Sequence, residues 1–169
     1  MNTRISRRRV SVAGLLSGLL TGCGFTLRGN QNFVFSSVAV LPHPGSAVAQ
    51  ELRRSFGGVV QVLGADKPVS QAEVVLQIHD EQREKVVVGV NASGQVREFQ
   101  LRLRVTFSLT TGQGKELIAQ DRILQQRDIS YNESAALAKE VEEDLLYRDM
   151  QTDIVQQILR RLAVVKQLS

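Results

Sequence analysis

Apolar and polar residues alternate most regularly in the middle of the chain. Between residues 99 and 109 every second residue is apolar, and the residues between them are polar or charged. A period of two over this length indicates a β-strand with one buried and one solvated face. Turn sequences lie on both sides, N-A-S-G at residues 91–94 and T-G-Q-G at residues 111–114. This part of the chain therefore predicts an antiparallel meander.

Apolar runs on either side of this strand supply its partners. Residues 74–78 and 85–90 are mostly apolar and flank a polar centre at residues 80–84. They form either one long, bent strand or two strands. Residues 117–129 predict the third strand of the meander.

The N-terminal part of the chain predicts a strand and a helix. Residues 38–41 are apolar and end at the sequence P-H-P-G, so they predict a short strand. Ser46 is a suitable helix N-cap, and two glycines at residues 57–58 close the helix. Its apolar residues recur every four positions, at Val48, Leu52 and Phe56. Residues 59–63 are open to interpretation as another short strand.

The C-terminal part predicts one long helix. Asn132 or Ser134 is positioned to cap it, and it extends to about Val165. Apolar residues recur at helical spacing, at Leu137, Val141, Leu145, Leu146, Met150, Ile154, Ile158 and Leu162. The predicted fold class is α+β, a two-layer sandwich with two helices packed on a roughly four-stranded, mostly antiparallel sheet.

The single cysteine, Cys23, follows a leader-like segment. Four arginines precede an apolar run at residues 10–20, which is shorter than the roughly 20 residues of a membrane span and typical of a signal peptide. The ending L-T-G-C resembles the lipobox of bacterial lipoproteins. That resemblance implies cleavage before Cys23, a diacylglyceryl thioether on its thiol and acylation of the new N-terminus. We therefore expect a signal peptide at residues 1–22 and one domain at residues 23–169; the alternative is a buried free cysteine.

Several acyl chains would hold the protein at a membrane, whereas a single chain binds only marginally. Gly24 follows the cysteine. In enterobacterial sorting an Asp at that position retains a lipoprotein in the inner membrane, so Gly24 is compatible with the outer membrane. Residues 6–10 loosely resemble a twin-arginine signal but lack the usual apolar pair and Lys, which favours general secretion.

Removal of the leader changes the charge balance. The whole chain has a formal net charge of +4, but the leader contains four arginines and no acidic residue, which leaves 17 basic and 17 acidic residues. The high isoelectric point therefore gives no support to nucleic-acid binding. With Cys23 as the only cysteine, no disulfide framework is predicted.

The sequence contains no recognisable catalytic or metal-binding motif. His43 lies between two prolines and His79 near a strand end, and neither belongs to a metal-ligand pattern. Three consecutive acids at residues 142–144 fan around a helix, so they indicate a solvated face and not a catalytic pair. We expect no enzyme activity, no cofactor and no metal.

Charge is nevertheless unevenly distributed. Residues 83–104 contain five basic and two acidic residues, while residues 133–153 contain seven acidic and two basic residues. A basic, strand-rich surface suits anionic or phosphorylated partners, because guanidinium groups bind phosphate oxygens in a forked geometry. The alternative is an ordinary solvated sheet face.

Three segments resemble the LPS-assembly lipoprotein (LptE) family. The sequence C-G-F-T-L-R-G at residues 23–29 is similar to the start of the mature proteins of that family. Residues 94–101 are similar to its central hairpin, and residues 136–162 to its C-terminal helix. The order and spacing of these segments carry the resemblance over nearly all of the mature chain.

The resemblance implies a function without catalysis. Members of the family lie in the outer membrane, plug the lumen of the β-barrel LptD, assist its assembly and take part in inserting lipopolysaccharide into the outer leaflet. They also bind lipopolysaccharide, and their fold has two helices on a four-stranded sheet. The alternatives are a lipoprotein scaffold of another envelope complex and, less favoured, an envelope hydrolase.

The resemblance places one basic site residue directly. Lys139, in the sequence L-A-K, matches a position linked to lipopolysaccharide contact, although an ion pair with Glu143 would explain it equally well. A second basic residue of the family, just before the hairpin turn, has no counterpart here, and Arg97 lies beyond the turn. Arg102 and Arg104 are further candidates for lipopolysaccharide binding on charge alone.

Overall fold

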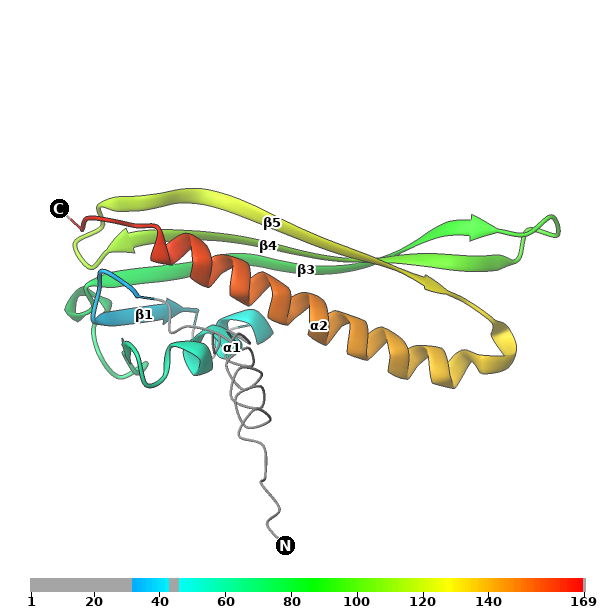
Figure 1. Cartoon of the computed structure of the whole chain (residues 1–169), viewed down its shortest axis with the longest axis horizontal. Helices are drawn as coiled ribbons and strands as arrows, with labels where there is room; N and C mark the ends of the chain where they lie inside the picture. Colours follow the sequence, from blue (N-terminus) through cyan, green and yellow to red (C-terminus); the bar gives the residue numbers. More distant parts are fainter. Residues whose placement is uncertain (1–31, 43–45, 169) are drawn as a thin grey trace, which may run out of the picture. The chain divides into compact units, whose positions relative to one another are not determined.

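The computed structural model describes residues 32–42 and 46–168. In chain order the elements are β1 (Ser37–Leu41), α1 (Ala47–Phe56), β2 (Gln61–Val62), η1 (Val69–Gln71), β3 (Val74–Val90), β4 (Val96–Thr111), β5 (Glu116–Ser130), η2 (Glu133–Ala135) and α2 (Ala136–Ala163). β3, β4 and β5 run side by side as three long strands, and α2 extends along them (Figure 1). The α+β fold class is confirmed.

The sheet has five strands in the order β2-β1-β3-β4-β5. β3, β4 and β5 form the predicted antiparallel meander. β1 pairs in parallel with both β2 and β3, so the sheet is mixed and has one strand more than the four expected. The parallel pairing of β1 with β2 follows from α1, which carries the chain back between them.

The polar centre at residues 80–84 does not interrupt β3, which is one continuous strand. Its pairing with β4 shifts by one residue between Ile78 and Asp80. Such a bulge leaves the strand intact but exchanges its two faces. Before the shift, Ile78 lies opposite the buried Phe107; after it, Glu81 lies opposite the buried Val105. The odd-numbered residues of the polar centre therefore lie on the side of the sheet that carries the core.

α1 forms as the sequence predicts. Ser46 accepts a hydrogen bond from the backbone N–H of Ala49 (3.3 Å), and Val48, Leu52 and Phe56 are fully buried. A Glu81 side-chain oxygen also accepts a hydrogen bond from the N–H of Val48 (3.1 Å). A carboxylate at this end of a helix is favoured by the helix dipole. The bulge in β3 thus also helps to fix α1 on the sheet.

The chain entering β1 is fastened to the start of β3. The carboxylate of Glu73 accepts hydrogen bonds from the backbone N–H of Ser36 (2.7 Å) and from its hydroxyl (2.8 Å). These bonds favour the charged form, so the pKa of Glu73 lies below its ordinary value. The N–H of Glu73 in turn donates to the hydroxyl of Ser37 (3.0 Å).

The apolar residues of α2 form two ridges instead of the single stripe expected. Met150, Ile154, Ile158 and Leu162 are fully buried, but Leu137, Val141 and Leu145 are 80%, 63% and 53% exposed. A helix turns about 100° per residue, so a four-residue spacing drifts by about 40° at each step. By this geometry the exposed ridge lies roughly 120° around the helix from the buried one. From Leu146 and Tyr147 onward α2 packs on the core, whereas Leu137, Val141 and Leu145 point away from it.

Polar contacts add to the packing of α2. Gln151 and Thr152 donate hydrogen bonds to the carboxylate of Glu51 in α1 (2.6 and 3.0 Å). Arg161 pairs with Asp121 of β5. Within the described ranges, no helix combines the length and apolar character of a membrane span.

A leucine-to-alanine substitution is expected to have different effects on stability in the two ridges. Leu162→Ala removes a fully buried side chain and is expected to lower the free energy of unfolding by about 2–5 kcal/mol. Leu137→Ala, the matched control on the same helix, is expected to change it by less than about 0.5 kcal/mol. Urea unfolding followed by circular dichroism measures both. Equal losses in the two variants would contradict the division of α2.

Candidate functional site

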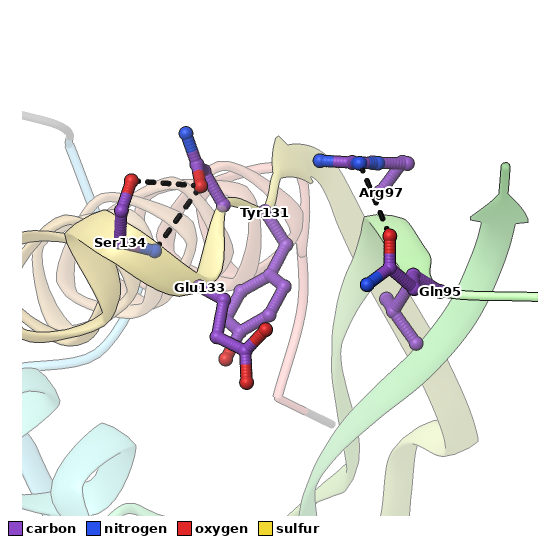
Figure 2. A pocket seen from close by; sticks show the side chains of 7 residues that line it. Gln95, Arg97, Tyr131, Glu133 and Ser134 are labelled. Atoms are coloured by element: carbon purple, nitrogen blue, oxygen red, sulfur yellow. Dashed lines mark hydrogen bonds between the residues drawn. The ribbon is translucent and has the colours of Figure 1, made fainter. Parts of the chain in front are cut away.

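Two loops meet at one end of the meander and line an open cavity of about 450 Å³ (Figure 2). They are the β3–β4 turn and the connection from β5 to α2. The N–H of Tyr131 donates to the backbone oxygen of Arg97 (2.7 Å), which joins them. The lining residues are Gln95, Val96, Arg97, Tyr131, Asn132, Glu133 and Ser134.

Local hydrogen bonds shape both walls of this cavity. The side-chain oxygen of Asn91 accepts from the N–H groups of Ser93 and Gln95 (3.0 and 2.9 Å), which closes the predicted turn. Gly94 has φ +79°, a conformation that glycine adopts without strain. On the other wall, Asn132 accepts from the N–H and the hydroxyl of Ser134 (3.1 and 2.9 Å) and so caps η2. The long helix α2 itself starts after Ala135 without a side-chain cap, so the cap expected from Asn132 or Ser134 lies one element earlier than predicted.

A second cavity of about 160 Å³ shares Tyr131 with the first. It lies between the first turns of α2 and strands β3 to β5. The ring of Tyr131 meets that of Phe99 edge-on, with centroids 5.3 Å apart. The lining residues are Lys85, Phe99, Ile129, Ser130, Tyr131, Ala136, Lys139, Glu140 and Glu143.

Both lysines of the second cavity are paired. The Nζ of Lys85 lies 2.6 Å from a carboxylate oxygen of Glu143 and 4.5 Å from the centre of the Phe99 ring. The Nζ of Lys139 donates to the hydroxyl of Ser130 (3.0 Å) and to Glu142 (2.8 Å). The expected i,i+4 pair of Lys139 with Glu143 is therefore replaced by an i,i+3 pair with Glu142.

The four basic residues expected to form the site lie on two faces of the sheet. Lys139 lines the second cavity and Arg97 the first. Arg102 and Arg104 alternate with the buried Leu101 and Leu103, so they lie on the face without helices. Arg104 there pairs with Glu84 (3.0 Å). Arg102 donates through Nε to Gln100 (2.8 Å).

Lys85 is the cavity residue that sequence reasoning missed. It was counted among the basic residues of the hairpin, but nothing placed it beside Lys139. The bulge near Asp80 puts it opposite the buried Leu101 and hence under α2. The only signal in the sequence was that the apolar–polar alternation stops at residues 80–84. That signal does not show at which residue β3 exchanges its two faces.

Tyr147 lies next to this cavity and is held in its neutral form. Its hydroxyl donates to the backbone oxygen of Glu84 (2.8 Å), and the Arg83 guanidinium lies 5.1 Å from its ring centre. Burial raises the pKa of Tyr147, and the negative charge of Glu143 raises it further.

The remaining candidate groups do not join this arrangement. The Nε2 of His79 lies 2.8 Å from the hydroxyl of Ser108, on another part of the sheet. In residues 32–42 and 46–168, no three His, Cys, Asp or Glu residues converge in a way that could hold a metal ion. His43, Cys23 and the expected signal peptide lie outside the described residues. The cavities present cations, carboxylates and aromatic rings, and the cations are the groups that could bind an anion.

A family model and two related proteins point to the same protein family. The family model described as "LptE: Lipopolysaccharide-assembly" matches residues 30–162. The LPS-assembly lipoprotein LptE of Yersinia enterocolitica is 30% identical over 159 residues, which cover 90% of this chain and 73% of that protein. The protein of the same name from Photorhabdus laumondii is 28% identical over 160 residues, with 90% and 83% covered.

A solved structure agrees in both fold and sequence. The solution NMR structure of uncharacterized lipoprotein B from Nitrosomonas europaea is similar with a TM-score of 0.70 and 34% identity. The match covers 83% of this chain and 90% of that one.

Tyr147 provides a test of the geometry beside the second cavity. The chain has two tyrosines and no tryptophan, so tyrosinate absorbance resolves their ionisation. Because its folded pKa is raised, Tyr147 is expected to ionise above the usual value of about 10. Its contribution to stability is complete below that pH and is lost as the pH rises through the folded pKa.

Tyr147→Phe should remove this late ionisation and cost about 1 kcal/mol of stability. Tyr131→Phe, the matched control, should leave it in place. A late ionisation that survives in Tyr147→Phe would contradict the assignment.

Proposed function

The chain belongs to the LptE family of lipopolysaccharide-assembly lipoproteins, and from this premise we propose that it fills the lumen of an LptD-type outer-membrane β-barrel. In that position it would help to assemble the barrel and take part in inserting lipopolysaccharide into the outer leaflet. The observation that carries the proposal is the family match over residues 30–162. The match spans every strand and nearly all of α2.

The membrane attachment that we propose is a lipid anchor. Residues 1–22 would be removed as a signal peptide, and Cys23 would carry the acyl chains. Gly24 is compatible with delivery to the outer membrane, because it is not the Asp that retains lipoproteins in the inner membrane. The protein would then face the periplasm from within the barrel lumen.

The helix-free face of the sheet supports a position inside a barrel. Most of its side chains on β3, β4 and β5 are polar, and several are bonded to one another, as in the contacts of Arg104 with Gln82 (2.9 Å) and of Gln100 with Asp128 (3.0 Å). Val86 and Leu124, opposite Gln100 and Arg104, are apolar exceptions. The interior of an outer-membrane barrel is also polar. A plug with such a face can therefore pack against that wall with polar groups facing polar groups.

We propose that lipopolysaccharide contacts the protein at Lys139 and Arg97. These residues line adjoining cavities, which suits a ligand that carries several negative charges. Arg102 and Arg104 lie on the opposite face, so the same lipid molecule would not reach all four. They are better placed against the barrel wall.

The proposed function is structural and involves no chemical reaction. It follows from the family resemblance and from cavities that offer cations and aromatic rings. The second candidate is a scaffold for another envelope complex. It differs in its partner, so isolation of the native complex separates the two.

Affinity isolation of the tagged, lipidated protein from native envelopes in mild detergent tests the main proposal. One large β-barrel is expected in about equal amount to the bait, identified by mass spectrometry. A tagged, unrelated outer-membrane lipoprotein serves as the control for detergent carry-over. Recovery of other partners with no barrel would replace the plug with the scaffold.

Cys23→Ser tests the anchor separately. Without the thiol no thioether can form, so the variant is expected to leave the outer-membrane fraction and to keep its leader. Fractionation and intact-mass measurement read out both effects. An unchanged mass and location would contradict lipidation at Cys23.

A further inference from the structure

The first half of α2 carries a row of apolar side chains that no part of the described chain covers. Leu137, Val141 and Leu145 are each more than half exposed. They follow one another at four-residue spacing, so they are neighbours on the helix surface and form one continuous ridge. α1 bonds to α2 at Gln151 and Thr152, beyond this ridge (Figure 1). Single exposed apolar side chains are ordinary, whereas a contiguous apolar surface bordered by polar groups marks a site of interaction.

Carboxylates border the exposed ridge on both sides. At about 100° per residue, Glu140 and Asp144 lie along one side of it, and Glu142 and Asp149 lie along the other. All four side chains belong to exposed residues. Glu142 is paired with Lys139 (2.8 Å), but the other three form no ion pair with any residue in the ranges 32–42 and 46–168. The surface is therefore apolar along its centre and negative along its borders.

A membrane surface does not match these borders. Helices that lie in a membrane interface carry lysine and arginine on their polar side, which attract anionic lipids. Residues 137–149 contain five acidic and two basic residues, a net charge of −3. Of the two basic residues, Lys139 is held by Glu142, and Arg148 lies beyond the last side chain of the ridge. An anionic lipid would be repelled along both borders.

A second copy of the chain does not match them either. Two-fold association brings the same patch of both copies into contact. The carboxylates of one ridge would then face those of the other, and like charges across an interface are unfavourable. The ridge also has only three large apolar side chains, whereas a stable protein interface uses about 20–30 residues a side. A short segment of a partner is the better match in size.

We propose that the exposed ridge binds an amphipathic segment of another polypeptide, with apolar residues along its centre and lysine or arginine along its borders. The apolar residues of the segment pack on Leu137, Val141 and Leu145, and its cations pair with the bordering carboxylates. Apolar anchors at helical spacing are a common mode of peptide recognition. The proposal concerns the outer side of α2, so it depends neither on the lipopolysaccharide contact nor on the barrel proposed above.

A synthetic probe tests the chemistry of this surface. The probe is a fluorescent peptide of leucine and lysine, about five helical turns long, with its leucines on one side of the helix. A matched probe has glutamate in place of each lysine. Fluorescence anisotropy measures binding to the lipidated protein in zwitterionic detergent, and micelles alone give the background. The wild type is expected to bind the lysine probe and not the glutamate probe, with weaker binding as salt screens the charges.

The variants separate the centre of the surface from its borders. Val141→Ser removes an apolar side chain from the ridge, and Glu140→Gln combined with Asp144→Asn removes charge from one border. Val164→Ser is the matched control, because Val164 is also exposed but lies beside Arg160. Serine and valine have similar helix propensities, so these variants should keep the fold, which circular dichroism confirms.

Val141→Ser is expected to weaken binding of the lysine probe about 5- to 10-fold, the effect of losing one partly buried valine side chain. The double carboxylate variant should weaken it about 3- to 10-fold at low salt and should reduce its salt dependence. Val164→Ser should bind as the wild type does. Equal binding of the two probes, or equal affinities of Val141→Ser and Val164→Ser, would overturn the proposal.

Two further measurements distinguish the other occupants. A dimer of the wild type in sedimentation that Val141→Ser abolishes would assign the ridge to a second copy of the chain. Binding to phosphatidylglycerol vesicles that the same variant abolishes would assign it to lipid. Either result would replace the polypeptide partner.

A photo-reactive residue in place of Leu137 locates the partner segment in native envelopes. Mass spectrometry of the cross-linked peptide is expected to place the attachment in a segment whose apolar residues are flanked by lysine or arginine. Attachment to an acidic segment or to lipid would contradict the proposal. Affinity isolation that recovers no barrel would leave this result unaffected, and failure of the ridge to bind the lysine probe would leave the barrel proposal standing.

Discussion

The register shift between Ile78 and Asp80 decides which charged side chains lie between the sheet and its helices. Upstream of it the core face of β3 is apolar; downstream the same face presents Glu81, Arg83 and Lys85. Each of these residues contacts a different part of the helical layer: the start of α1, the ring of Tyr147 and the carboxylate of Glu143. A single extra residue in one strand thus sets the position of α1 and creates a cavity beneath α2.

The division of α2 follows from this charged surface. Over the apolar part of the sheet, the buried ridge from Met150 to Leu162 packs in the ordinary way. Over the charged part, an apolar ridge would bury lysine and arginine without partners, at a large cost. The helix instead places Lys139 and Glu143 there, and its own apolar ridge faces solvent. The two ridges belong to different four-residue series, Leu137 to Leu145 and Met150 to Leu162, so the helix changes its apolar side without a kink.

Sequence patterns predicted most of the elements but not the relation between their faces. The alternation at residues 99–109 identified β4, and Ser46 with Val48 to Phe56 identified α1, because these signals depend on near neighbours. The parallel pairing of β1 with β2 and β3 joins segments that are distant in the sequence, and no local pattern predicts it. The same limit applies to the site. Lys139 was named by resemblance and Arg97 by its position near the hairpin turn, whereas Lys85 joins Lys139 only through the bulge.

The free edge of β5 bears on the proposed position inside a barrel. β5 is a 15-residue edge strand, and such an edge can pair with strands of another protein. A barrel under assembly is a source of unpaired strands, so a plug needs protection against joining them. Asp121, Arg122, Arg127 and Asp128 distribute charge of both signs along β5, and Asp121 and Arg127 are also held by α2. Charged residues on an edge disfavour strand addition. In the proposed position they would let the protein contact the wall as a separate domain and not as one more strand.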